Sequence, residues 1–273
     1  MSSSIELTGV RQVFDVRDSH GRPEQFVALE GLDLTIRAGE LFVLVGPSGC
    51  GKSTVLDLIS GLNRPAAGTI RVGDRLVEQP GLDRGFVFQQ YTLLPWRTAQ
   101  GNIEFALEAA GGLRRAERRE RAREYLDLVG LLDFADRYPH ELSGGMKQRV
   151  AIARSLSYEP EVLLMDEPYG ALDAQTRERL QHELLAIWRR TGTTVVFNTH
   201  DIDEAVFLGQ RVGVMSNRPG RLKAVVEVGL DHEATKDVRS TEQFAHHRHQ
   251  IWTLLRSDLQ AADEDRAEVE RVA

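Results

Sequence analysis

The chain has 273 residues and a formal net charge of −7, from 34 basic and 41 acidic side chains. This length suits one large α/β domain, or one domain with a sub-domain. The mild acidity argues against a dedicated nucleic-acid-binding protein, which would normally be basic. One cysteine excludes an internal disulfide framework and fits a reducing cytosol. Because the sequence contains neither a signal peptide nor an apolar run of the ~18–20 residues that span a bilayer, we expect a cytosolic protein that reaches membranes only through a partner.

The N-terminal part of the chain predicts a β-rich region. Antiparallel strands are expected for four alternating apolar segments, at residues 5–7, 10–14, 26–29 and 32–36. Residues 18–23 predict a hairpin tip, and residues 37–40 a turn. Leu41 to Val45 is wholly apolar, as expected for a strand buried on both faces.

A phosphate-binding loop follows this strand. Residues 46–53 fit the pattern G-x-x-x-x-G-K-[ST], and a helix is predicted from Ser53 to Ser60. Glycines let the backbone approach phosphates closely, while the loop amides and the helix N-terminus attract an anion. We expect Lys52 to reach the β- and γ-phosphates, Ser53 to ligate Mg²⁺, and Thr54 to lie near the α- and β-phosphates. The predicted nucleotide-binding residues here are Gly46, Pro47, Ser48, Gly49, Cys50, Gly51, Lys52, Ser53 and Thr54. Cys50 is expected to be a structural filler, with a reactive thiol as the alternative.

The middle of the chain changes character. Residues 65–88 predict short strands broken by Gly68, Gly73 and Gly81. A helical sub-domain is then expected at about residues 89–157, with helices at 103–110, 114–129 and 147–157. Six arginines lie between residues 114 and 123, but glutamates interleave with them at three- and four-residue spacing. This pattern indicates a solvated, ion-paired helix face rather than a nucleic-acid-binding patch.

The α/β core resumes after this insertion. Strands are predicted at 162–165, 195–197, 211–215 and 224–228, and a helix at 176–190. From residue 229 to 273 the chain is a charged, mostly helical tail. Its three histidines, His246, His247 and His249, are interpreted as part of a solvated face and not as a metal site, because no cysteine or carboxylate stands at ligand spacing.

Two carboxylates end the strand at 162–165. Asp166 and Glu167 follow this apolar run directly. Together with the phosphate loop they resemble the acidic pair of a nucleotide hydrolase. In such a site Asp166 would hold Mg²⁺, and Glu167 would orient and deprotonate the attacking water, a contribution of ~10²–10⁴ in rate.

The whole set of motifs resembles the ATP-binding cassette (ABC) family. In chain order it comprises the phosphate loop at 46–53, Phe88-Gln89, the signature at 142–149, Asp166-Glu167, the dimer loop at 171–173 and the switch segment at 199–201. The resemblance covers about residues 5–228. It implies an α/β P-loop NTPase core with an antiparallel β sub-domain and an inserted α-helical sub-domain, and a nucleotide-binding domain over residues 5–228.

The resemblance also implies roles for residues outside the phosphate loop. Ser143, Gly144, Gly145 and Gln148 match the signature that one subunit places over the nucleotide of another. Small residues before a helix beginning near Met146 would present amides and a helix dipole to an anion. The remaining roles go to Gln89, which would sense Mg²⁺ and the γ-phosphate, to His200, which would position the water, and to Asp173, which would link the two sites.

An aromatic ring usually stacks on adenine in this family. Phe14 is our prediction for that ring, and Phe26 is the competitor, because the insertion at 15–25 leaves the register open. A plain core role for Phe14 is the third interpretation. Base stacking on such a ring contributes ~1–3 kcal/mol.

Finer features resemble one branch of the family. The segments 89–96, 200–205 and 215–221 look like the nitrate, sulfonate and taurine importers, although Gln90 and Asn198 depart from that pattern. The resemblance implies an ATPase that uses ATP and Mg²⁺ at the cytoplasmic face of a bacterial inner membrane. Its partners would be a second ATPase subunit in a homodimer, permease subunits and, indirectly, a periplasmic binding protein, with no nucleic acid. The alternatives are a soluble regulatory ATPase and the ATPase of an export or release system.

Overall fold

The computed structural model describes residues 2–17, 21–232 and 237–256. Its contacts divide the chain into two compact units. We call Gly81–Val195, together with the first residues of the chain, the helical unit, and Ser4–Pro80 with the chain from Val196 onward the phosphate-loop unit. Among the described residues, no helix is both long and apolar enough to cross a membrane.

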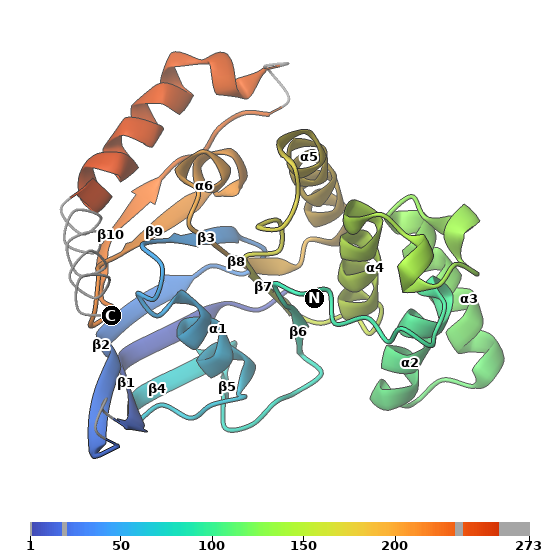
Figure 1. Ribbon diagram of the computed structural model, residues 1–273, viewed down its shortest axis with the longest axis horizontal. Helices are drawn as coiled ribbons and strands as arrows, with labels where there is room; N and C mark the ends of the chain where they lie inside the picture. The colour runs from blue at the N-terminus through green and yellow to red at the C-terminus, as the bar shows by residue number, and fades with distance from the viewer. Residues whose placement is uncertain (1, 18–20, 233–236, 257–273) are drawn as a thin grey trace. The chain divides into compact units, whose positions relative to one another are not determined.

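A four-stranded antiparallel sheet forms one part of the phosphate-loop unit (Figure 1). Its strand order is β2-β1-β4-β5, and its strands are β1 (Ile5–Arg17), β2 (Pro23–Ile36), β4 (Ala67–Val72) and β5 (Arg75–Leu76). The two long strands each merge two segments that the alternation pattern separates. The interruptions are register shifts within the pairing of β1 and β2, for example between Leu7 and Val10, and not turns. Residues 18–20 of the predicted hairpin tip lie outside the described residues.

The prediction that Gly68 breaks a strand is wrong. Gly68 lies inside β4 with a φ of +83°, where a Cβ would stand 2.4 Å from the carbonyl oxygen of Gly9. The close approach of the two backbones requires a glycine within the strand, so the residue marks strand packing and not strand termination.

A second sheet of this unit carries the phosphate loop. The strand order within the unit is β10-β9-β3-β8, with β3 (Leu41–Val45), β8 (Thr194–Thr199), β9 (Arg211–Met215) and β10 (Leu222–Glu227). All five residues of β3 are buried, and β3 runs parallel to β9. The helices α1 (Lys52–Ser60) and α6 (Ile202–Leu208) follow β3 and β8. Each helix therefore starts at the carboxyl end of a strand, where ligands of α/β sheets bind.

The helical unit combines two parallel strands with a group of helices. β6 (Arg84–Val87) pairs with β7 (Val162–Asp166). The helices are α2 (Ala99–Ala110), α3 (Arg115–Leu128), α4 (Gly144–Leu156) and α5 (Ala174–Thr191), with short 3₁₀ turns at Leu132–Phe134 and Pro139–Glu141. The helices α2, α3 and α4 pack on one another, as Figure 1 shows. In the arginine-rich run, Arg114, Arg118 and Arg121 form ion pairs with Glu117, Glu108 and Glu159, so three of its six arginines are paired.

Three helices of this unit begin earlier than the apolar periodicity predicts. The caps are Thr98, Ser143 and Asp173, and each side chain accepts a hydrogen bond from an amide of the first turn. Apart from Met146, the residues between these caps and the predicted starts are small or polar and contribute no apolar period, although a capping side chain still satisfies the first amides. The helix α4 accordingly starts at Gly144 and not near Met146.

Candidate functional site

The phosphate loop is built for close approach of an anion. Gly49 and Gly51 have φ angles of +76° and +99°, which only glycine adopts readily. Gly51 is the N-cap of α1, and no side chain caps that end of the helix. A helix N-terminus without a side-chain cap can present its first amides to a phosphate group, which the helix dipole also favours.

Lys52 is held within this loop. Its side chain is almost fully buried, and its Nζ donates hydrogen bonds to the carbonyl oxygens of Gly46 (2.8 Å) and Pro47 (3.0 Å). A buried ammonium needs such partners because burial without them would be costly. Cys50 is fully buried, and its Sγ lies 2.8 Å from the point where a Cβ on Gly46 would stand. This tight contact supports the structural role predicted for Cys50.

The two candidate aromatic rings are cross-strand neighbours. Phe14 of β1 pairs with Phe26 of β2, which places both side chains on one face of the sheet. The guanidinium of Arg218 lies over the Phe26 ring, 5.3 Å from its centroid. Phe14 is half-buried, and no ring or cation contact is described for it.

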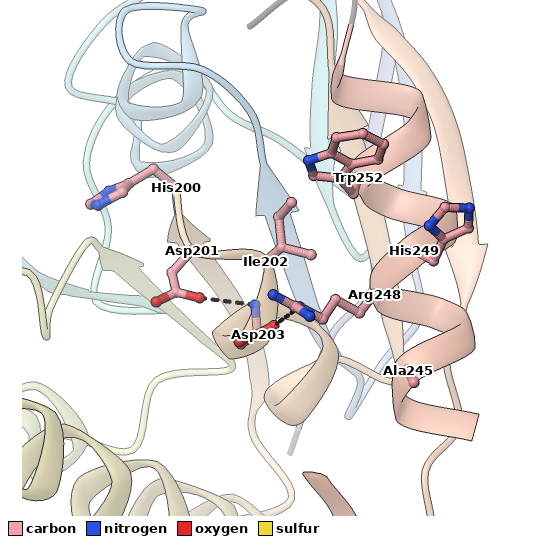
Figure 2. Close-up of a pocket in the computed structure, with 8 residues that line it drawn as sticks. All are labelled: His200, Asp201, Ile202, Asp203, Ala245, Arg248, His249 and Trp252. Carbon is pink, nitrogen blue, oxygen red and sulfur yellow. Dashed lines mark hydrogen bonds and ion pairs between the residues drawn. The ribbon is translucent and has the colours of Figure 1, made fainter. Parts of the chain in front are cut away.

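His200 stands at the turn from β8 into α6 and is exposed. Asp201 caps α6 by accepting hydrogen bonds from the amides of Asp203 (2.8 Å) and Glu204 (3.1 Å), and its own amide donates to Thr199 Oγ1 (3.0 Å). Figure 2 shows His200 and Asp201 on one side of a cavity of about 660 Å³. The capped turn fixes the backbone that carries the histidine.

The other side of this cavity is a helix of the tail, at residues 242–256 (Figure 2). Its Arg248 forms an ion pair with Asp203 of α6, with 2.6 Å between Nε and Oδ1. Phe244, Ile251 and Leu255 form its buried face. Within the predicted tail of residues 229–273, the structure describes an α-helix at residues 242–256, and residues 233–236 and 257–273 lie outside the described residues. The described residues contain no group of three or more His, Cys, Asp or Glu side chains that could hold a metal.

The acidic pair of the helical unit lies at the end of β7. Glu167 has a φ of +41°, an unusual value for a residue with a side chain, and its carbonyl accepts a hydrogen bond from the amide of Gly170 (3.2 Å). Such strain persists where the surrounding structure holds it, and it gathers at functional sites. The side-chain Nε2 of Gln89 lies 3.8 Å from the point where a Cβ on Gly170 would stand. The Gln89 side chain therefore lies next to the turn that carries Glu167.

The signature residues gather other motifs around the start of α4. Ser143 is exposed and accepts a hydrogen bond from the amide of Met146 (3.3 Å). A Cβ on Gly144 would stand 2.9 Å from Leu172 Cδ2 and 3.1 Å from the Tyr91 hydroxyl. Gly144 therefore lets the signature, the dimer loop and the segment after Gln89 approach one another.

Two more predicted residues differ in their surroundings. Gln148 is fully buried, and neither polar atom of its amide has a hydrogen-bond partner among the described residues. Asp173 is exposed and caps α5, and the hydrogen bond that it accepts from the Thr176 amide lowers its pKa.

The predicted site residues therefore fall into two groups. Phe14, His200 and the phosphate loop belong to the phosphate-loop unit, and all the others belong to the helical unit: Gln89, Ser143, Gly144, Gly145, Gln148, Asp166, Glu167 and Asp173. The sequence interpretation missed Arg218, whose Nε donates a hydrogen bond to the carbonyl of Gly49 (3.0 Å). The sequence interpretation used segment 215–221 only as a resemblance to one family branch. No local pattern predicts that the Arg218 side chain contacts the phosphate loop.

The oxygen donors suit magnesium. Ser53 is exposed at the N-terminus of α1, and Asp166 is half-buried at the end of β7. A hydroxyl, a carboxylate and the amide oxygen of Gln89 are hard ligands, and Mg²⁺ takes few protein ligands alongside substrate phosphates. The residues present therefore fit the ion.

Comparisons with known proteins agree with these features. A profile of the ABC transporter family matches residues 29–170. The nitrate import ATP-binding protein NrtD of Synechocystis sp. is 47% identical over 258 residues, 92% of this chain and 95% of that protein. An uncharacterized ABC transporter ATP-binding protein of Methanocaldococcus jannaschii is 48% identical, with 95% and 94% of the two chains covered.

A solved structure shares the fold. It is a dimeric, post-hydrolysis state of the ATP-binding cassette MJ0796 bound to ADP and Pi, 35% identical, with a TM-score of 0.70 over 82% of this chain and 98% of that one. These matches confirm the predicted fold class and the use of ATP and Mg²⁺. The chain belongs to the ABC transporter family, and it is an ATP-binding subunit with ATPase activity.

Proposed function

We propose that this ATPase energises an importer of a small anionic or zwitterionic solute of the nitrate, sulfonate and taurine class. One observation carries the proposal: the similarity to a nitrate import ATP-binding protein extends over 92% of this chain. The acting form would be a homodimer bound to permease subunits at the cytoplasmic face of the membrane. A periplasmic binding protein would deliver the solute to the permease.

The proposed mechanism assigns a task to each group of residues. The amides at the start of α1 and the Lys52 ammonium bind the β- and γ-phosphates, and Phe14 stacks on adenine. Glu167 orients the attacking water and accepts its proton, while His200 contacts the γ-phosphate and positions that water. Mg²⁺, held by Ser53, Asp166 and Gln89, would offset the charge that develops on the phosphate oxygens.

The second copy of the chain completes the proposed mechanism. Ser143, Gly144 and Gly145 of one chain cover the γ-phosphate bound by the other, and Asp173 links the two sites. The exposed Ser143 at the start of α4 supports this arrangement, because it offers a hydroxyl and a helix N-terminus to a partner. The fully buried Gln148 would support the signature from within its own unit. We further propose that residues 5–228 form the nucleotide-binding domain, with residues 89–157 as its helical sub-domain and residues 229–273 as a tail.

The exposed aromatic residues of the helical unit support docking to a membrane protein. Trp96 is 70% exposed and Phe105 is 43% exposed, and Arg97 lies over the Phe105 ring at 5.0 Å. Exposed apolar side chains that form a contiguous patch mark interaction sites, and we propose that these two aromatic residues belong to one. The segment that leads to Trp96 is held in place by α4, because Arg154 donates hydrogen bonds to both the carbonyl and the hydroxyl of Thr92 (2.8 and 2.9 Å).

The first test separates a transport subunit from a soluble regulatory ATPase. Trp96→Asp should release the protein from membrane fractions while its basal ATP hydrolysis remains. Trp252→Asp is the matched control, since that tryptophan is also exposed, at 42%, but belongs to the tail helix. Equal membrane recovery of both variants and the unmodified chain would contradict the docking proposal.

The second test addresses direction and solute. Cells that carry the chain or its Glu167→Gln variant are compared for uptake of labelled nitrate, taurine and an alkanesulfonate. Import of one solute that depends on Glu167 is the expected result. ATP-dependent loss of solute from the cells would favour the export alternative instead.

A further inference from the structure

The loop that follows β9 is fixed to β2 through its backbone and packs against the phosphate loop. The amide of Gly220 donates a hydrogen bond to the carbonyl of Ala28 (2.9 Å), and its carbonyl accepts one from Glu30 (3.1 Å). A Cβ on Gly220 would stand 2.1 Å from the carbonyl oxygen of Cys50. Residues 216–221, which we call the brace loop, therefore pack between β2 and the phosphate loop, and only glycine fits at position 220.

Arg218 extends this contact with its side chain. Its Nε donates a hydrogen bond to the Gly49 carbonyl at 3.0 Å, and its guanidinium lies over the Phe26 ring at 5.3 Å. A Cβ on Gly49 would stand only 2.3 Å from Arg218 Nη2. Position 49 thus favours a glycine for its positive φ, and a side chain there would also displace the end of this arginine.

The guanidinium is suited to this double contact. It is planar, permanently charged and rich in donors, so it can stack on an aromatic face and donate a hydrogen bond at the same time. Lysine offers a point charge and cannot do both. Within one unit, Arg218 therefore connects the aromatic pair of Phe14 and Phe26 with the peptide of Gly49 in the phosphate loop.

We propose that Arg218 is a positioning residue for ATP, which sets nucleotide affinity by holding the phosphate loop in its binding shape. The inference rests on the proposed role of that loop and adds a residue that lies outside the nucleotide-binding motifs described above. Because Arg218 holds the Gly49 carbonyl, its loss frees that peptide to rotate, and Gly49 itself offers little resistance. Binding then has to reorder the loop, and affinity falls.

Arg218→Ala tests the proposal with two ligands, ATP and inorganic triphosphate, each measured by calorimetry on the full chain. The expected Kd is raised about tenfold for both ligands, a value in the range for a lost hydrogen bond to a charged group. The KM for ATP should rise by a similar factor, with a much smaller change in kcat. Arg221→Ala is the matched control: this arginine lies in the same loop, and its described hydrogen bonds are made by the backbone. It should bind both ligands as the unmodified chain does.

The outcomes separate this inference from the proposed function. If Lys52→Ala abolishes triphosphate binding while Arg218→Ala retains normal affinity for triphosphate, the role of Arg218 is refuted and the phosphate loop stands. If Lys52→Ala also binds triphosphate normally, the proposed loop itself fails. Arg218→Lys provides the same test in a chain that keeps its charge, and it should recover only part of the affinity. Full recovery by lysine would show that charge alone suffices and would overturn the positioning role.

Discussion

The phosphate loop and the signature turn (residues 142–145) are both glycine-containing turns that lead into a helix, but the N-termini of the two helices are capped differently. The N-cap of α1 is Gly51, which leaves the helix amides uncapped, and the buried Lys52 supplies a positive charge beside them. At α4, the exposed Ser143 caps its own helix, and Gly144 is braced by Tyr91 and Leu172. The first turn combines an uncapped helix N-terminus with a buried positive charge, two features that suit an anion. The second is a firmly supported surface that suits a ligand brought by another chain.

The largest expected effect separates hydrolysis from binding. Glu167→Gln should reduce turnover by ~10²–10⁴ while ATP still binds, because the phosphate loop is intact and only the general base is lost. Turnover is measured by phosphate release and binding by calorimetry. Glu159→Gln is the control, since this glutamate also has a positive φ, of +54°, but pairs with Arg121 on α3. Normal turnover in Glu167→Gln would remove that residue from its proposed role.

A smaller effect is expected at the base. Phe14→Ala should weaken ATP binding by about 1–3 kcal/mol, the usual contribution of one stacked base. Its affinity for inorganic triphosphate should remain, because that ligand has no base. Phe26→Ala should weaken ATP less, since its ring already carries Arg218. If Phe26→Ala were the more damaging change, the choice between the two rings would be reversed.

The smallest of these effects should appear only in the dimer. Gly144→Ala places a methyl group 2.9 Å from Leu172 Cδ2 and 3.1 Å from the Tyr91 hydroxyl, so these side chains must move away from the signature, at a cost of about 1–3 kcal/mol. Affinity for ATP, measured on the dilute monomer, should stay unchanged, whereas turnover at high protein concentration should fall. Gly101→Ala, in the first turn of α2, should leave both measurements near normal. An equal loss of ATP affinity in the monomer would mean that the signature turn acts within its own chain.

The sequence predicts local features well and tertiary contacts poorly. The strands β3 and β9 have the predicted bounds because each is a short buried run that ends at a turn. The continuity of β1 was missed because its register shifts resemble turns in a pattern of alternation. Motif residues such as Lys52 and Glu167 can be identified from the sequence because their chemistry dictates residue type and spacing. The contact of Arg218 with Gly49 joins residues far apart in the chain, and no periodicity encodes it.

The buried amide of Gln148 has a consequence for anyone who engineers this chain. A polar group without a hydrogen-bond partner lowers the free energy of unfolding by about 1–3 kcal/mol, and an apolar residue of similar shape removes that penalty. A selection for heat-resistant variants would therefore favour an apolar residue in place of Gln148. Such a selection would act against the very side chain that the signature carries, so resistance to heat and transport should be scored together.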